Sequence, residues 1–254
     1  MNTRKDQLKA FERLLDIMDE LREKCPWDRK QTNESLRTLS IEEIYELSDA
    51  IIENDSDEIK KELGDVFLHL VFYSKIAAEK GDFDVADVLN SICDKLIYRH
   101  PHIYGDTTAD TEEKVLENWE KLKLKEGNTS VLSGVPTSLP AMVKAYRIQD
   151  KVKGVGFEFE NADQVFEKIQ EEIQEFKNEE DPKAKEMEFG DILFSLINYG
   201  RFFGINSEDA LERSNKKFIH RFQILEDLAK EKGLIMGEMT LNQLDELWNL
   251  AKIR

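Results

Sequence analysis

Hydrophobic positions recur at helical spacing through most of the chain. Residues three and four apart share one face of an α-helix, so this recurrence predicts amphipathic helices that each bury one face. The alternation of apolar and polar residues that is typical of strands is almost absent. The recurring apolar positions are Leu8, Phe11, Leu15 and Met18; Ile44, Leu47 and Ile51; Val66, Leu70, Tyr73 and Ala77; and Val165, Ile169, Ile173 and Phe176. The pattern predicts an all-α fold of about ten helices.

Short polar motifs predict where several helices begin, because a Ser, Thr, Asp or Asn side chain can accept a hydrogen bond from the free backbone N–H groups of the first turn. The motifs are Ser40 with Glu43, Ser56 before Asp57 and Glu58, Asn161 with Gln164, Ser207 before Glu208 and Asp209, and Thr240 with Gln243. Residues 126–140 are instead rich in Gly, Pro, Ser and Thr. We therefore expect a linker at 126–140 between an N-terminal module, 1–125, and a C-terminal module, 141–254.

Three sequence elements occur twice in the same order, which indicates an internal duplication. Each copy has an EExxE element, then an element of the form E-hydrophobic-G-D followed by apolar residues, then a K-x-I-x-R element. The first copy reads EEIYE at 42–46, ELGDVFLHLV at 62–71 and KLIYR at 95–99; the second reads EEIQE at 171–175, EFGDILFSLI at 188–197 and KFIHR at 217–221. The chain is therefore predicted to contain two tandem helical modules.

Each copy carries four acidic residues, arranged as one pair three residues apart on each of two successive helices. This spacing puts both members of a pair on one helix face. Four carboxylates beside an apolar seam would repel one another and take up protons unless a divalent cation neutralised them. Ligation by oxygen alone favours Mg²⁺, with Mn²⁺ as a substitute. The candidate metal ligands are Glu43, Glu46, Glu62 and Asp65 in the first copy and Glu172, Glu175, Glu188 and Asp191 in the second.

Other interpretations of these acids stay open at this point. In a chain with 53 acidic residues an isolated ExxE pair is usually a solvated helix face, and Glu43 could close a capping box with Ser40. Capping does not explain Glu172, which falls well inside a predicted helix. A di-iron or di-manganese centre would need Glu-x-x-His on two helices, and none of the four histidines has a Glu three residues before it.

A Lys and an Arg one helical turn apart follow each acidic set, Lys95 with Arg99 and Lys217 with Arg221. Mg²⁺ held by a few carboxylates is a typical setting for substrate phosphates, and cationic side chains would contact the phosphate oxygens that the metal leaves free. A single such pair is more often a solvated helix face, but its recurrence beyond both acidic sets favours a phosphate site.

Charge and hydropathy narrow the class of partner and the compartment. The 53 acidic residues outnumber the 36 basic ones, and the formal charge of −17 disfavours a nucleic-acid polymer as partner. No stretch approaches 18 uninterrupted apolar residues, so we expect no membrane span. Cys25 and Cys93 lack metal-ligand or CxxC spacing and are expected to be free thiols. These features favour a cytoplasmic protein.

At these residues the sequence resembles the MazG family of nucleoside triphosphate pyrophosphohydrolases, whose mark is EExxE followed by ExxD. The resemblance covers nearly the whole chain. It departs from the family at Met187, where another Glu is frequent, and at Phe159, where Trp is common. Further matching segments are CPWDRKQT at 25–32, RHPHIYGD at 99–106, ENWEKLK at 117–123 and the segment 130–157.

The resemblance implies an all-α enzyme of two MazG modules that cleaves nucleoside triphosphates (NTPs) to the monophosphate (NMP) and pyrophosphate with Mg²⁺ and accepts several bases. It also implies a homodimer whose four-helix bundles join helices from both subunits. It assigns the eight acids as metal ligands, and Glu42 and Glu171 as residues that either support these ligands or orient the attacking water. Lys217 and Arg221 would stabilise the charge that develops on the leaving phosphates. The residues expected at the phosphates and base are Lys95, Arg99, Asn215, Lys217, Arg221 and Trp248.

Several alternatives remain at this stage. The chain could be a pyrophosphatase dedicated to one nucleotide, or a non-catalytic acidic module that binds a basic partner. Trp248 could stack on the base or pack in the core. Because Cys93 stands where the second copy has Asn215, we expect the second module to carry most of the turnover. The sequence predicts neither the preferred base nor the cellular role, which could be the clearing of aberrant nucleotides or the lowering of alarmone levels.

Overall fold

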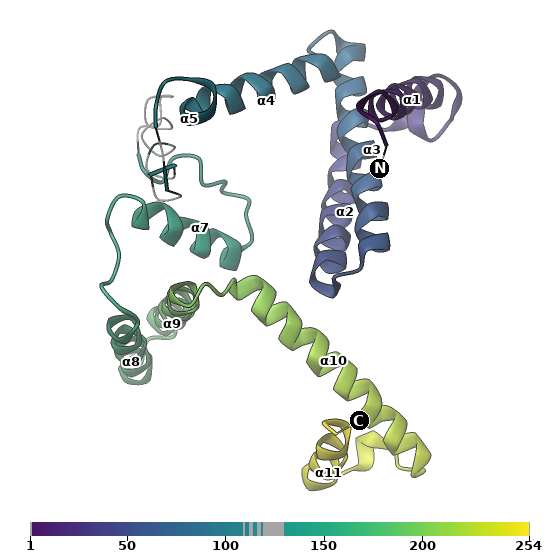
Figure 1. Cartoon of the computed structure of the whole chain (residues 1–254). Helices are drawn as coiled ribbons and strands as arrows, with labels where there is room; N and C mark the ends of the chain where they lie inside the picture. The colour runs from purple at the N-terminus through teal and green to yellow at the C-terminus, as the bar shows by residue number, and fades with distance from the viewer. Residues whose placement is uncertain (1, 109, 112–113, 116–117, 119–129, 254) are drawn as a thin grey trace. The chain divides into compact units, whose positions relative to one another are not determined.

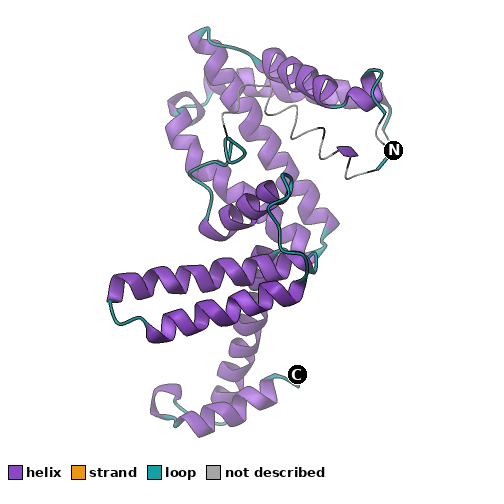
Figure 2. Ribbon diagram, turned by 90° about the vertical axis from the view of Figure 1, so that its left-hand side faces the viewer, coloured by secondary structure: helices purple, strands orange, loops and turns teal. Residues whose placement is uncertain are grey.

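The computed structural model describes residues 2–108, 110–111, 114–115, 118 and 130–253. Over these residues the chain forms ten α-helices and two short 3₁₀ helices and no strand, which confirms the predicted all-α fold (Figures 1 and 2). The chain divides into two compact units, unit 1 at Met1–Asp110 and unit 2 at Thr111–Arg254. Of the predicted linker, residues 126–129 lie outside the described part and residues 130–140 form turns.

Unit 1 is built on a helical hairpin of α2 and α3, with α1 packed against α3. Its core consists of Met18 from α1, Leu36 from α2, and Val71, Phe72 and Ile76 from α3, all at most 3% exposed. Asn54 turns the chain between α2 and α3 in the left-handed conformation, with φ of 57°. The elements of unit 1 are α1 (Arg4–Lys24), η1 (Asp28–Lys30), α2 (Asn33–Glu53), α3 (Ser56–Lys80), α4 (Val85–Arg99) and α5 (Pro101–Tyr104).

Unit 2 repeats the hairpin as α8 and α9, with α7 packed on α9. Helix α10 leads away from the hairpin and carries α11 at its far end (Figures 1 and 2). A second core lies between α10 and α11 at Leu225, Leu228, Ala229, Leu247 and Ala251. The elements of unit 2 are α7 (Ala141–Lys153), α8 (Ala162–Asn178), α9 (Pro182–Phe202), α10 (Ser207–Glu231), η2 (Met236–Glu238) and α11 (Leu241–Ala251).

The helix starts show where the local motifs predicted correctly. Asn161 caps α8 by accepting from the N–H of Gln164, and Thr240 forms the expected capping box with Gln243 on α11. The prediction that a helix starts at Ser40 is wrong, because α2 begins seven residues earlier with Thr32 as its cap. The caps of α3 and α10 are Asp55 and Asn206, each one residue before the Ser that the motif predicted.

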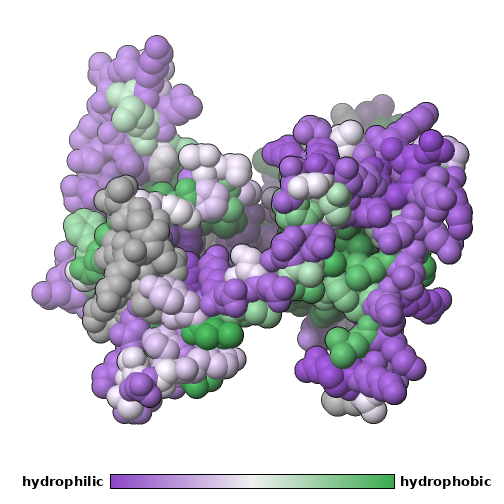
Figure 3. Space-filling model, turned by 90° about the horizontal axis from the view of Figure 1, so that it is seen from above, coloured by the Kyte–Doolittle hydropathy of each residue, from purple (hydrophilic) through white to green (hydrophobic). Residues whose placement is uncertain are grey.

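Both hairpins leave much of their apolar surface open. On α3, Leu63, Phe67 and Leu70 are between 42% and 57% exposed, and α9 leaves Phe189 and Leu196 about half exposed. Green, hydrophobic side chains accordingly appear at the surface among the purple ones in Figure 3. Among the described helices none is long and apolar enough to cross a membrane.

Candidate metal-binding sites

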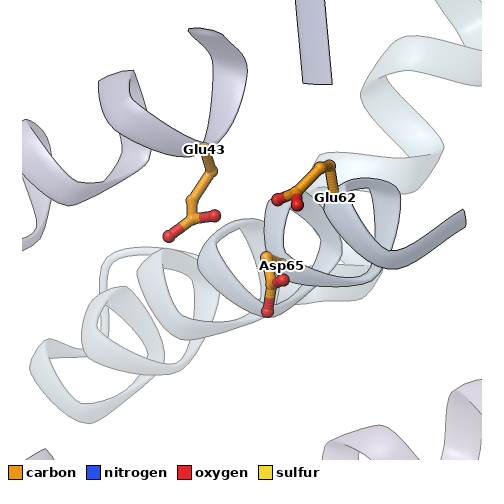
Figure 4. A group of neighbouring side chains, drawn as sticks. All are labelled: Glu43, Glu62 and Asp65. Carbon is orange, nitrogen blue, oxygen red and sulfur yellow. The ribbon is translucent and has the colours of Figure 1, made fainter. Parts of the chain in front are cut away.

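Three of the four acids predicted in the first copy come together between α2 and α3. One carboxylate oxygen from each of Glu43, Glu62 and Asp65 lies within 4.8 Å of the others. Glu43 projects from α2 towards Glu62 and Asp65, which stand one turn apart on α3 (Figure 4). The i, i+3 spacing therefore brings Glu62 and Asp65 to one face, and the antiparallel hairpin brings Glu43 opposite them.

Glu62 is the buried member of this group, with 3% of its surface exposed. Its Oε1 accepts a hydrogen bond of 2.8 Å from Lys61 Nζ, while its buried Oε2 has no hydrogen-bond partner among the described residues. A buried carboxylate oxygen without a partner is costly, because it has lost its water. A cation bound at the group would give this oxygen a ligand.

The electrostatics of Glu43 also favour a cation. Burial raises the pKa of Glu43, and the negative charges of Asp65, Glu46 and Glu62 raise it further. A raised pKa means that the carboxylate form is destabilised by its surroundings. A proton or a divalent cation would relieve this repulsion.

The second copy assembles its carboxylates in the same way between α8 and α9. One oxygen from each of Glu172, Glu188 and Asp191 lies within 4.8 Å of the others. Here the buried member belongs to the first helix, since Glu172 is 6% exposed, whereas in unit 1 it is Glu62 on the second helix. The same three positions therefore meet in both copies, but the buried position differs between them.

Lys168 is a residue of this site that the sequence analysis missed. Its Nζ lies 2.8 Å from Glu172 Oε1 and 3.0 Å from Glu171 Oε1, and these hydrogen bonds raise the pKa of Lys168. The spacing could have signalled it, because Lys168 stands three and four residues before the two glutamates and must share their helix face. A lysine beside the carboxylates would also reach a bound phosphate.

The fourth acid of each set, Glu46 and Glu175, is exposed and lies outside the close group of three. Glu175 still interacts electrostatically with the group of three. Desolvation raises the pKa of Glu175, and the negative charges of Glu172 and Glu188 raise it further. Glu42 and Glu171 are also exposed on the hairpin helices. Glu171 is held by Lys168, so its carboxylate is fixed beside the group rather than within it.

The structure does not bring the basic pairs to the acids within one unit. Lys95 and Arg99 lie on α4, which leads away from the C-terminal end of α3 (Figure 1). That end of α3 lies about 22 Å along the helix axis from Asp65, at 1.5 Å per residue. Lys217 and Arg221 lie on α10, which leads away from the α8–α9 hairpin (Figure 2). Among the described residues, neither Lys217 nor Arg221 forms an ion pair with the carboxylates of α8 and α9.

The remaining substrate-binding candidates also lie on the α10–α11 arm. Asn215 is exposed and its amide donates to Glu212 Oε2 at 3.2 Å. Trp248 is half-buried beside the core of α10 and α11, with its ring centroid 5.1 Å from that of Phe218. This packing favours the core interpretation of Trp248 within a single chain.

His69, on the α3 face next to the acidic group, acts as a hydrogen-bonded structural residue. Its Nδ1 lies 2.8 Å from Ser40 Oγ, which also lies 2.8 Å from the hydroxyl of Tyr73. Burial lowers the pKa of His69, which favours the neutral ring at pH 7. These contacts link α2 to α3 directly beside Glu43 and Asp65.

The donor set of both groups fits Mg²⁺ or Mn²⁺. It consists of carboxylate oxygens alone, with three per group close enough to share one ion and open surface beside them. Neither group includes a Cys or a His, the ligands that zinc and iron favour.

The chain is similar in sequence to several known proteins. A profile of the MazG nucleotide pyrophosphohydrolase domain matches residues 31–104, which contain the first carboxylate group. The chain is 43% identical to the nucleoside triphosphate pyrophosphohydrolase/pyrophosphatase MazG of Thermotoga maritima, over 95% of both chains. It is 38% identical to the nucleoside triphosphate pyrophosphohydrolase of Escherichia coli K12, over 96% of this chain and 98% of the other.

A third relative is the protein YabN of Bacillus subtilis, which is 44% identical over 95% of this chain and 51% of its own length. The two pyrophosphohydrolases match from end to end, so the similarity extends through both hairpins and not only through the profile match. The chain therefore belongs to the MazG family of nucleoside triphosphate pyrophosphohydrolases.

Proposed function

We propose that this chain hydrolyses nucleoside and deoxynucleoside triphosphates to the monophosphate and pyrophosphate, depends on Mg²⁺, and accepts several bases. The observation that carries the proposal is the pair of three-carboxylate groups at corresponding positions of the two hairpins. In each group a buried glutamate lies beside two other carboxylates and accepts a hydrogen bond from one lysine. The two full-length relatives are named nucleoside triphosphate pyrophosphohydrolases, which supports cleavage that releases pyrophosphate.

The carboxylates of each hairpin would hold the metal. In unit 1 these are Glu43, Glu62 and Asp65, and in unit 2 Glu172, Glu188 and Asp191, with Glu46 and Glu175 beside them. Bound Mg²⁺ supplies charge neutralisation, which lets the anionic triphosphate approach a protein of net charge −17.

Water attack at the α-phosphorus needs an acceptor for its proton and an orientation in line with the leaving pyrophosphate. Glu42 and Glu171, the first residues of the two EExxE elements, would accept the hydrogen bond from this water. Lys168 fixes the Glu171 carboxylate in position, which supports this role in unit 2.

The cations that stabilise the leaving pyrophosphate would come from a second copy of the chain. Lys217, Arg221 and Asn215 lie on the α10 arm, away from the acids of their own hairpin. The half-exposed apolar faces of the hairpins support a homodimer, since a partner helix would cover them. Lys95 and Arg99 would serve the first module in the same way.

Pyrophosphate release from the four NTPs and the four dNTPs, each with Mg²⁺ or with excess EDTA, tests this function. We expect all eight to be cleaved with Mg²⁺ and none with EDTA. Cleavage of a single nucleotide would favour the dedicated pyrophosphatase. No cleavage at all, together with a melting temperature that Mg²⁺ does not change, would favour the acidic interaction module.

A further inference from the structure

A network of hydrogen bonds joins α2 to α3 one helical turn from the unit 1 carboxylate group. Ser40 Oγ lies 2.8 Å from His69 Nδ1 and 2.8 Å from the hydroxyl of Tyr73. It also donates a 2.9 Å hydrogen bond to the backbone oxygen of Leu36. Leu36 and Ser40 belong to α2, whereas His69 and Tyr73 belong to α3. Two of the three contacts therefore cross from one helix of the hairpin to the other.

The Ser40 hydroxyl uses its full hydrogen-bonding capacity in this network. A hydroxyl has one hydrogen to donate and two lone pairs with which to accept. A backbone oxygen can only accept, so the hydrogen of Ser40 points to Leu36 O. The two bonds across the hairpin are then donated by His69 Nδ1 and by the Tyr73 hydroxyl. Loss of the Ser40 oxygen would break both of these bonds at once.

The network lies on the helix faces that carry the carboxylates. Ser40 stands three residues before Glu43 on α2, and His69 stands four residues after Asp65 on α3. Each is therefore one turn from an acid on the same face, roughly 5 Å along the helix axis. Because the hairpin is antiparallel, a step towards the start of α2 lies opposite a step towards the end of α3. The network and the carboxylates are thus successive contacts along one seam.

The carboxylates of this seam oppose its closure. Glu43 on α2 faces Glu62 and Asp65 on α3, and one oxygen of each lies within 4.8 Å of the others (Figure 4). Like charges at this separation repel, so without a cation the carboxylates push the two helices apart. Hydrogen bonds between the helices one turn away resist this separation.

Unit 2 has no counterpart of the Ser40 hydroxyl. The repeat places Ile169, which has no polar side-chain atom, where unit 1 has Ser40. Ile169 is 4% exposed and belongs to the apolar interior. Tyr199 stands at the place of Tyr73, and its ring packs against Phe203 with 5.1 Å between the ring centroids. A link through a hydroxyl at this position is therefore particular to unit 1.

We propose that the three side chains of this network, Ser40, His69 and Tyr73, are positioning residues for the unit 1 metal site. They keep the α2 carboxylate opposite the two α3 carboxylates before a metal binds. Binding then needs less rearrangement of the ligands, which raises the affinity of the group for the metal. The inference rests on the proposed function, since it takes this group to hold Mg²⁺ or Mn²⁺.

The test measures the dissociation constant of Mn²⁺ from the EPR signal of the free ion, with no nucleotide present. The parent is the full chain with Glu188→Gln and Asp191→Asn, which silence the unit 2 group. A chain in which Glu62→Gln and Asp65→Asn silence the unit 1 group as well gives the background binding by surface acids. The difference between the two reports the unit 1 group.

Two pairs of variants in the parent separate the hydrogen bonds from the bulk of the side chains. Ser40→Ala removes the central hydroxyl and Ser40→Thr keeps it. His69→Leu removes the ring nitrogen, whereas His69→Asn keeps an N–H donor at the position of Nδ1. We expect Ser40→Ala and His69→Leu each to weaken Mn²⁺ binding about tenfold, as does loss of groups that support metal ligands. Ser40→Thr and His69→Asn should bind Mn²⁺ nearly as the parent does.

Ser74→Ala is the matched control. Ser74 is a buried serine of α3, 5% exposed, and its hydroxyl donates a 2.9 Å hydrogen bond to Leu70 O within the same helix. Its loss removes a buried hydroxyl without breaking a bond between α2 and α3. It should leave the Mn²⁺ dissociation constant unchanged even where the melting temperature falls. All variants are compared well below their melting temperatures, where a merely structural role leaves Mn²⁺ binding unchanged.

Equal Mn²⁺ affinity in Ser40→Ala and the parent overturns the inference. An equal loss in Ser74→Ala, or in both Ser40→Thr and His69→Asn, overturns it too. NTP cleavage by the unmodified chain is measured in parallel. If this chain cleaves NTPs and Ser40→Ala binds Mn²⁺ normally, only this inference fails. If the parent binds no more Mn²⁺ than the background chain, the inference and the unit 1 metal site both fail. If the parent binds Mn²⁺ and Ser40→Ala weakens it but NTPs are not cleaved, the proposed function fails and the positioning role stands.

Discussion

At the scale of single residues, the two buried glutamates are the most informative positions. Glu62 and Glu172 are 3% and 6% exposed, yet each faces other carboxylates and has a single lysine as its cationic hydrogen-bond partner. A bound divalent cation would stabilise a buried carboxylate that lies beside other carboxylates. Their environment distinguishes them from the many exposed acids of these helices.

Replacing Glu62 and Glu172 by Gln together should lower pyrophosphate release by about a hundredfold or more, because both groups lose their buried anionic ligand while keeping its shape. A matched double variant changes Glu12 and Glu167, which are exposed glutamates on α1 and α8, to Gln. It should retain full activity. Equal loss in the two double variants would mean that activity responds to net charge rather than to the carboxylate groups.

The raised pKa values of Glu43 and Glu175 predict how stability depends on pH in the absence of metal. Desolvation and neighbouring carboxylates hold the pKa of each folded group above its ordinary value of 4.5. The folded state therefore binds more protons than the unfolded chain above pH 4.5, and the stability from these groups is lost as pH rises through the folded pKa values.

Melting temperatures between pH 4.5 and 8, in EDTA and in Mg²⁺, measure this effect. We expect the decline with pH to be steeper in EDTA, because Mg²⁺ replaces the protons, and to be less steep in EDTA for Glu43→Gln with Glu175→Gln than for the unmodified chain. The Mg²⁺-induced rise in melting temperature should also shrink in this variant. Identical curves for the variant and the unmodified chain would show that neither group is coupled to folding.

At the scale of helices, the apolar periodicity was sufficient to predict the helices of both hairpins, because it records which face of each helix is apolar. It was not sufficient to predict how much of that face is buried: Phe67 and Leu70 fit the pattern but are more than half exposed. A sequence pattern marks a face without naming what covers it. The start of α2 was missed because serine often caps helices, so Ser40 was taken as a cap. Its hydroxyl instead forms hydrogen bonds inside the hairpin, with the backbone oxygen of Leu36 and the side chains of His69 and Tyr73.

Duplication was the signal that made the site predictable. Three acids of each copy meet as the repeat suggested, whereas Lys168 was missed. Lys168 occurs in one copy only, because Leu39 stands at the equivalent place in unit 1.

The two hairpins should contribute unequally to turnover. Unit 2 has Asn215, Lys217 and Arg221, which we propose contact the phosphates, and it has Lys168 beside its acids. Unit 1 has Cys93 in the place of Asn215. We expect Glu172→Gln with Glu188→Gln to remove most of the activity and Glu43→Gln with Glu62→Gln to remove the smaller part. A larger loss from the unit 1 pair, measured as kcat for ATP, would reverse this assignment.

At the scale of the whole molecule, the account requires a second copy of the chain. The acids of α8 and α9 lack cations from their own α10, and the hairpins expose apolar faces that a partner would cover. Light scattering at micromolar concentration should therefore give twice the chain mass of 29.6 kDa. A mass of 29.6 kDa in a preparation that cleaves NTPs would contradict the contribution of α10 from a partner.

The central claim, that the carboxylate groups would hold Mg²⁺ and that water attacks the α-phosphorus, is tested most directly by the products formed from ATP in ¹⁸O-labelled water. The products are followed by ³¹P NMR and mass spectrometry, with Mg²⁺ or with excess EDTA. The account predicts AMP that carries the label, unlabelled pyrophosphate, and no reaction in EDTA. ADP with orthophosphate, label in the pyrophosphate, or full activity in EDTA would contradict it.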